Sequence, residues 1–115
     1  MMKQLGRHVI LEMWEATNLN DARILEQALR DTVEAVDGHL LDVRVVEFPV
    51  HGVTGVAIIS ESHVAVHTWP EHGYAAIDIF TCNLEADLDA GIEAMKKHFL
   101  PGQTQVIEVR RGLRG

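Results

Sequence analysis

The hydrophobic pattern of the chain changes period several times, and two stretches have the period of an amphipathic helix. In residues 20–38 apolar side chains recur at three- and four-residue steps, and either Asn20 or Asp21 can cap the first turn. Gly38 can end this helix. Residues 85–99 carry a second stripe of the same kind, followed by a Pro-Gly pair that breaks a helix. The sequence therefore predicts two helices, each with one buried face.

The rest of the chain has the composition of short β-strands bounded by turn residues. Alternating or β-branched apolar runs occupy residues 8–14, 39–48, 52–60, 63–68, 74–82 and 104–110. The predicted order is β-α-β-β-β-β-α-β, which forms a single α+β domain over residues 1–115. We expect a two-layer sandwich in which two helices cover one face of an antiparallel sheet.

The other face of this sheet needs a cover of its own if it carries residues such as Val45, Val56 and Ile58. A second copy of the chain is the economical cover. The sequence therefore predicts a homodimer, possibly a higher oligomer, with the sheets packed across the subunit interface.

A polar tetrapeptide, Ser60-Glu61-Ser62-His63, interrupts the most strand-like part of the chain. Residues 69–73, between the next two predicted strands, have a turn composition, so these strands should form a hairpin. Pairing centred on that turn makes the numbers of partner residues sum to about 143, which sets Cys82 opposite Glu61. The only cysteine of the chain is therefore expected beside the polar interruption.

His67 follows Ser62 by five residues, and this odd spacing puts the two side chains on opposite faces of a regular strand. The polarity of residues 60–63 is that of a bend or bulge, and a single bulge would return both side chains to one face. A flat, uninterrupted strand through Ser62 is incompatible with a direct Ser62–His67 contact.

The block SESHVAVHTWPEHGYAAIDIFTC, with GVTGVAII before it and LGRH near the N-terminus, resembles the prokaryotic S-adenosylmethionine decarboxylase proenzyme family. The resemblance spans nearly the whole chain. It implies a precursor that cuts itself between Glu61 and Ser62, leaving a β chain of residues 1–61 and an α chain of residues 62–115. It also implies a lyase that removes carbon dioxide from S-adenosylmethionine to supply spermidine and polyamine biosynthesis.

The same resemblance implies a role for each residue of the reactive segment. Ser62 would attack the Glu61 carbonyl, turn the amide into an ester, and end as a covalent pyruvoyl group after β-elimination and hydrolysis. Such a group is an electron sink that forms a Schiff base with an amine substrate. His67 is implied as the base in self-processing, Cys82 as the proton donor in decarboxylation, and Thr54 as a hydroxyl that assists processing.

Three further positions match the substrate site of the family. Phe48 and Trp69 correspond to aromatic side chains that contact the adenine, and Glu71 to a carboxylate that binds the ribose hydroxyls. Members of the family are dimers with sites at the subunit interface, which agrees with the cover expected for the second face of the sheet.

Composition and charge narrow the classes of partner and location. The chain has 17 acidic and 10 basic residues and a net charge of −7, which argues against nucleic acid as a partner. The single cysteine, Cys82, rules out an internal disulfide framework and fits the reducing cytoplasm. The apolar run near the N-terminus is too short for a signal peptide or a membrane span. His63, His67 and His72 lack a second cluster of ligands, so no metal is expected.

Two alternatives to this function remain open. Proteins of this fold also decarboxylate arginine or ornithine by the same pyruvoyl chemistry. The other alternative is a dimer that binds nucleosides without catalysis, although intact Ser62, His67 and Cys82 argue against it. Without the resemblance, Ser62 would be interpreted as a turn residue and Cys82 as a small buried side chain.

Overall fold

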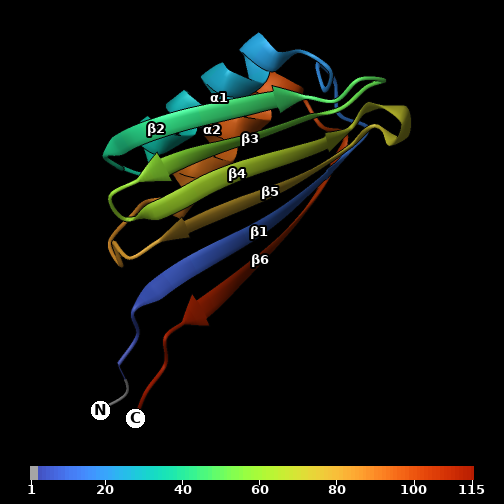
Figure 1. The fold of residues 1–115 in the computed structure, drawn as a ribbon. Helices are drawn as coiled ribbons and strands as arrows, with labels where there is room; N and C mark the ends of the chain where they lie inside the picture. Colours follow the sequence, from blue (N-terminus) through green and yellow to red (C-terminus); the bar gives the residue numbers. More distant parts are fainter. Residues whose placement is uncertain (1–2) are drawn as a thin grey trace.

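The computed structural model describes residues 3–115 and has the predicted order of elements (Figure 1). Its helices and the short 3₁₀ turn η1 are α1 (Ala22–Ala35), η1 (Pro70–His72) and α2 (Leu88–Phe99). Its strands are β1 (Gly6–Trp14), β2 (Leu40–Glu47), β3 (Val53–Ile59), β4 (Ser62–Trp69), β5 (Tyr74–Thr81) and β6 (Gln103–Arg111). Between residues 3 and 115, neither helix has the length and apolar character needed to cross a membrane.

All six strands form one antiparallel sheet in the order β2-β3-β4-β5-β1-β6. Figure 1 shows both helices on the far side of this sheet, with β1 and β6 extending beyond them. Helix α1 contacts β2, β3 and β4 and packs along α2, whereas β6 is exposed along its whole length. The predicted two-layer α+β architecture is confirmed.

Helix α1 begins and ends with regular capping motifs. The Asp21 carboxylate accepts hydrogen bonds from backbone N–H groups of the first turn, as one of the two predicted caps. The helix ends at Ala35, and the left-handed residue after it is Asp37 (φ 58°) rather than Gly38, which is the last residue of the terminating motif. The Gly38 N–H donates to the Val33 carbonyl at 2.8 Å, completing a Schellman motif around an aspartate that tolerates this backbone conformation.

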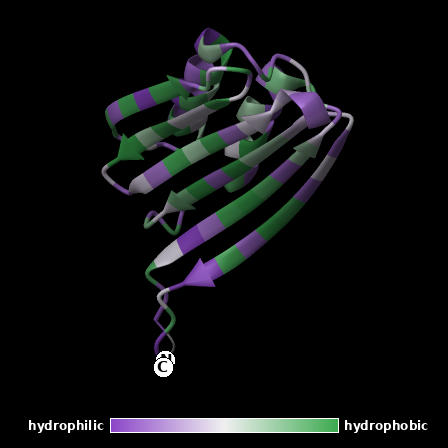
Figure 2. Ribbon diagram, turned by 45° about the vertical axis from the view of Figure 1, so that its right-hand side comes forward, coloured by the Kyte–Doolittle hydropathy of each residue, from purple (hydrophilic) through white to green (hydrophobic). Residues whose placement is uncertain are grey.

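The face of the sheet toward the helices forms the hydrophobic core. Figure 2 shows hydrophobic and hydrophilic residues interleaved along the strands, as expected when one face of each strand is buried. Val45 packs against this core, which corrects its expected position on the other face. It pairs with Gly55, and a Cβ at that position would lie 2.4 Å from Leu25 Cδ2. The missing side chain therefore lets α1 approach the sheet closely beside Val45.

The opposite face of the sheet, which we call the open face, has no covering layer within residues 3–115 (Figure 1). Val56 and Ile58 lie on it, as predicted, and Ile58 is 44% exposed. The strand registers put further exposed hydrophobic side chains on the same face: Trp14, Val46, Trp69, Ile107 and Val109. This surface is the one for which a second subunit is predicted.

Strand β4 is central in the sheet and connects two tight turns. Ser60 and Glu61 form a two-residue turn after β3, and β4 begins at Ser62. Its pairing with β5 runs unbroken from Ser62 opposite Thr81 to Trp69 opposite Tyr74, which is the predicted register. No bulge interrupts the strand, so the bulge that would have brought Ser62 and His67 to one face is absent from β4.

Candidate active site

The peptide bond between Glu61 and Ser62 lies where the two-residue turn passes into β4. The Cys82 backbone N–H donates to the Glu61 carbonyl oxygen at 2.9 Å, which confirms the predicted juxtaposition. The Cys82 thiol is free and exposed. We call Glu61, Ser62 and Cys82 the scissile cluster. A backbone N–H already on the carbonyl oxygen can stabilise the negative charge that develops there when the carbon is attacked.

Ser62 has a backbone conformation that side chains disfavour. Its φ is 153°, and sparsely populated conformations of this kind cost about 1–3 kcal/mol. Its Oγ lies 3.2 Å from Nδ1 of His63. Adjacent side chains of a regular strand point to opposite faces, so this contact depends on the irregular backbone at Ser62.

The Glu61 side chain is held by contacts with His39. Its carboxylate accepts the His39 backbone N–H at 3.0 Å and pairs with the His39 ring. The backbone hydrogen bond from His39, followed by the contact with its ring, lowers the pKa of Glu61. The same pair raises the pKa of His39. Glu61 is therefore held as a carboxylate, and the turn is tied to the segment that precedes β2.

A second group of predicted residues surrounds a pocket of about 430 Å³ at the opposite end of β4. We call it the aromatic pocket, and it is lined by Phe48, His51, Thr54, His67, Thr68, Trp69 and Glu71. Five of these residues are the candidates Phe48, Thr54, His67, Trp69 and Glu71. Aromatic surface combined with a few polar groups is typical of sites for small molecules.

The polar groups of the aromatic pocket form two contacts. Thr54 and His67 are paired across β3 and β4, and Thr54 Oγ1 lies 3.3 Å from His67 Nδ1. The Glu71 carboxylate pairs with His51 Nε2 at 2.9 Å. The pKa of Glu71 is lowered by a hydrogen bond with its own backbone and, to a smaller degree, by His51. Glu71 is therefore an ionised acceptor at neutral pH.

The scissile cluster and the aromatic pocket are separate within one chain. Five residues of extended strand separate Ser62 from His67, which corresponds to about 17 Å. Ser62 and Trp69, at the two ends of β4, are roughly 23 Å apart by the same measure. The structure thus brings the candidate residues together in two groups rather than one.

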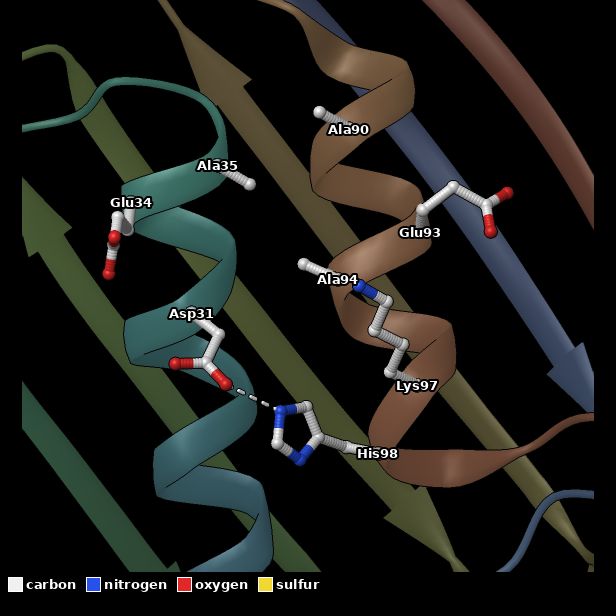
Figure 3. Close-up of a pocket in the computed structure, with 8 residues that line it drawn as sticks. All are labelled: Asp31, Glu34, Ala35, Ala90, Glu93, Ala94, Lys97 and His98. Carbon is white, nitrogen blue, oxygen red and sulfur yellow. Dashed lines mark hydrogen bonds and ion pairs between the residues drawn. The ribbon is translucent and has the colours of Figure 1, made fainter.

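A larger groove lies between the two helices, away from all the candidate residues. Figure 3 shows this groove of about 480 Å³, with the Asp31–His98 ion pair (2.7 Å) crossing it between α1 and α2. Its other lining residues are Glu34, Ala35, Ala90, Glu93, Ala94 and Lys97. Among residues 3–115 no group of three or more His, Cys, Asp or Glu side chains is arranged to hold a metal ion.

Three histidines make contacts that the sequence did not predict. His39 holds Glu61, His51 holds Glu71, and His63 contacts Ser62. For His63, the only sign in the sequence of a contact with Ser62 is that the two residues are neighbours in the polar tetrapeptide. His39 and His51 follow no periodic pattern, and their partners lie about twenty residues away in the sequence.

Comparisons with known proteins identify the family of the chain. Residues 7–112 match the family described as S-adenosylmethionine decarboxylase. The chain is 45% identical over 113 residues to the S-adenosylmethionine decarboxylase proenzyme of Thermomicrobium roseum, covering 97% of both chains. It is 44% identical over 114 residues to the proenzyme of that name from Methanococcus maripaludis, covering 97% of this chain and 93% of the relative.

Among solved structures, the crystal structure of the adenosylmethionine decarboxylase from Aquifex aeolicus has the same fold, with a TM-score of 0.89 at 24% identity. The match covers 98% of this chain and 95% of that one. The resemblance inferred from the ESH, GVTG and FTC segments is confirmed by these matches over nearly the full length, and the chain belongs to the S-adenosylmethionine decarboxylase family.

Proposed function

We propose that this chain is made as a proenzyme, cuts itself between Glu61 and Ser62, and decarboxylates S-adenosylmethionine. The products of cleavage are a β chain of residues 1–61 and an α chain of residues 62–115. The observation that carries the proposal is the geometry of the Glu61–Ser62 junction, with its positive φ and with the Cys82 N–H on the carbonyl oxygen. The relatives at 45% and 44% identity are named as proenzymes of this decarboxylase.

Self-processing uses groups already positioned at the junction. Ser62 Oγ attacks the Glu61 carbonyl carbon, the oxyanion is stabilised by the Cys82 N–H, and the C–N bond breaks to leave an ester. A base then removes the α-proton of residue 62, and the ester leaves as the Glu61 carboxylate. Hydrolysis of the unsaturated residue releases ammonia and leaves a pyruvoyl group. Relief of the backbone strain at Ser62 favours the first step.

The residues around position 62 fit a pyruvoyl group. That group supplies an electron sink for the carbanion that remains when carbon dioxide departs. The Cys82 thiol is exposed and lies one residue beyond the partner of Ser62 on β5, so it is placed to return a proton to the substrate.

The aromatic pocket supplies the binding site for the nucleoside. Phe48 and Trp69 offer aromatic surface for the adenine, and the ionised Glu71 accepts hydrogen bonds from the ribose hydroxyls. Thr54 and His67 lie in the same pocket and in mutual contact, and they provide the hydroxyl and the base for processing.

These two sets of residues serve one reaction only if they come from two subunits. S-adenosylmethionine is an amino acid joined to a nucleoside through sulfur and is far shorter than the roughly 23 Å between the ends of β4. We therefore propose a homodimer that packs open face to open face. A two-fold axis that runs between the sheets and across the strands reverses β4. Each scissile cluster then meets the aromatic pocket of the partner subunit.

The exposed hydrophobic side chains of the open face support this arrangement. Ile58 and Ile107 are 44% and 57% exposed in the single chain. They lie on β3 and β6, near opposite edges of the sheet, so the exposed hydrophobic surface extends across most of it. Covering such a surface with an identical one removes it from water, and the same rotation creates two equivalent sites. As in the sequence-based expectation, the cytoplasm is the proposed location, since the one cysteine is free.

Mass spectrometry under denaturing conditions tests the proposal directly. The purified protein should give two fragments divided between Glu61 and Ser62, the second without a free amino group. A single intact 12.8 kDa chain would contradict it. Release of carbon dioxide from S-adenosylmethionine, arginine and ornithine, measured in parallel, then tests the substrate.

The two alternatives are less well supported. Arginine and ornithine are not favoured, because the described relatives are named for S-adenosylmethionine. A nucleoside-binding dimer without catalysis would have no need of the strained Ser62 or of the thiol beside it. Calorimetry that detects nucleoside binding by a chain that never cleaves would favour this alternative.

A further inference from the structure

We propose that His63 is a catalytic residue of self-processing, whose Nδ1 takes the proton from Ser62 Oγ as this oxygen attacks the Glu61 carbonyl. The inference rests on the proposed function, since it concerns the same cleavage. Its basis is distance: Nδ1 of His63 lies 3.2 Å from Ser62 Oγ, close to the hydrogen-bond reach that a general base needs. Among the hydrogen bonds of residues 3–115, His63 is the side-chain partner of the Ser62 hydroxyl.

The His63 ring is held in place from the neighbouring strands. Phe80 is its partner across β4 and β5, and the two rings meet edge to face with centroids 5.7 Å apart. His8 stacks on Phe80 at 5.2 Å, and the Arg111 guanidinium lies 4.5 Å from the centroid of the same ring. The imidazole is therefore braced by β5, β1 and β6 with Nδ1 toward the attacking oxygen.

The charges around His63 keep it able to accept a proton. The ionisable groups that face it are His8 on β1, Asp78 on β5 and Arg111 on β6. Burial lowers the pKa of His63, with His8 and Arg111 acting in the same direction and Asp78 opposing them. The Asp78 carboxylate is hydrogen-bonded to His8 Nε2 at 2.9 Å, so it interacts more strongly with His8 than with His63. His63 is thus neutral at neutral pH.

The step balances without any other reactant. The Ser62 O–H proton moves to Nδ1 of His63 while the bond between Oγ and the Glu61 carbonyl carbon forms. When the C–N bond breaks, the same proton passes from Nδ1 to the departing nitrogen. One proton has moved from oxygen to nitrogen and His63 is neutral again. In the following step, His67 of the partner subunit removes the α-proton.

The experiment follows freshly made precursor over time, by mass and by treatment with hydroxylamine, which cuts an ester at residue 62. The variants are His63→Asn, which keeps a polar group near the position of Nδ1 but is not a base, and His63→Ala. His98→Asn is the matched control, because it makes the same change in the helical layer, where the ring of His98 pairs with Asp31 away from the scissile cluster. Melting temperatures show which variants are folded.

We expect wild type and His98→Asn to cleave at the same rate, and His63→Asn to cleave at least about a hundredfold more slowly, the lower end of the usual contribution of a general base. No hydroxylamine-sensitive ester should accumulate in His63→Asn, and added imidazole should restore cleavage to His63→Ala. The wild-type rate should fall with pH only below the ordinary histidine pKa of 6.5, and this decline should be absent from His63→Asn.

The possible failures are distinguishable. If wild type does not cleave, the proposed function fails. If wild type cleaves and folded His63→Asn cleaves at the same rate at every pH, the role of His63 is refuted while the proposed function stands. An ester that builds up in the His63 variants would place His63 after the acyl shift and would also overturn the inference.

Discussion

The two ends of β4 differ in what they can do. At Ser62 the strand begins with a strained backbone, a carbonyl oxygen bound to the Cys82 N–H and a hydroxyl beside a histidine. At Trp69 the strand ends in regular geometry beside a pocket of aromatic and polar side chains. We propose that the first end reacts and the second binds the substrate.

Under the proposed function, the fold divides one catalytic apparatus between two places that a single chain cannot bring together. The division follows from strand geometry, because a residue in an extended strand cannot fold back on its own neighbours. The proposed dimer brings reaction and binding together by adding a second chain with β4 running the opposite way.

The largest effect is expected at the reactive end. Ser62→Ala removes the attacking oxygen, so cleavage and decarboxylation should both fall below detection. The aromatic pocket is unchanged by this substitution, and calorimetry should still detect adenosine binding by the intact chain. Residual turnover in this variant would contradict the mechanism, and loss of binding would contradict the division between the two ends.

The next largest effect should come from the surface that joins the two ends across subunits. Position 58 is partly exposed in the single chain, so Ile58→Asp should leave the monomer folded. In the proposed interface the same substitution buries an unpaired carboxylate, at a cost of about 3 kcal/mol or more. Association should weaken by more than roughly a hundredfold. Size-exclusion chromatography should show monomers that fail to cleave.

Leu100→Asp is the matched control, since Leu100 is an exposed apolar residue at the end of α2. It should remain a dimer that cleaves at the wild-type rate. Dimeric Ile58→Asp that cleaves normally would exclude the open face as the interface.

A moderate effect is expected at the binding end. Trp69→Ala removes an aromatic surface from the pocket, and loss of one base-stacking contact costs about 1–3 kcal/mol. The KM for S-adenosylmethionine should rise roughly tenfold, while self-cleavage stays close to wild type. Trp69→Phe should restore most of the affinity. Equal losses in kcat and in cleavage would show that Trp69 acts on the reactive end instead.

The smallest effect should follow from loss of the exposed His39 ring, which pairs with Glu61 in the turn before β4. His39→Ala, made in the uncleavable Ser62→Ala chain, removes the ring that pairs with Glu61 but keeps the backbone hydrogen bond. The melting temperature should fall only slightly. The raised pKa of His39 means that its contribution is complete below the ordinary value of 6.5 and is lost as pH rises through the folded-state value.

The pH dependence gives this prediction its sign. Because the pKa of Glu61 is lowered, its contribution to stability is present above the ordinary value of 4.5. That contribution is lost as the pH falls through the folded-state pKa of Glu61. The difference between the two chains should therefore be largest between these two values and should vanish in alkali. A difference that grows with rising pH would contradict the assignment of the pair.

Much of the fold could be predicted because hydrophobic period and turn residues specify local structure. The hairpin through η1 is an example, since a turn centred on Pro70 and Gly73 sets the register that puts Cys82 beside Glu61. Val45 was assigned to the wrong face because its face depends on the register of β2 against β3, which pairs Val45 with Gly55 and which the sequence pattern did not specify.

The rest of the site depends on geometry that the sequence does not encode in a short pattern. The contact between Ser62 and His63 occurs at a residue with a positive φ angle, which no sequence pattern predicts. Because β4 has no bulge, the odd spacing of Ser62 and His67 puts their side chains on opposite faces of the strand. The sequence allowed a bulge here but could not show whether one is present. The resemblance suggested roles for these residues, and the structure shows that they lie in two separate groups.

The most direct test of the composite site is a mixed dimer of two inactive chains. One chain carries Ser62→Ala and keeps its aromatic pocket, and the other carries His67→Ala and keeps its scissile cluster. Each chain alone should remain uncleaved. When the two are expressed together with distinguishable masses, the chain with His67→Ala should be cut between Glu61 and Ser62, and decarboxylation should return. Mixed dimers that form but show no cut chain would contradict a site shared between subunits.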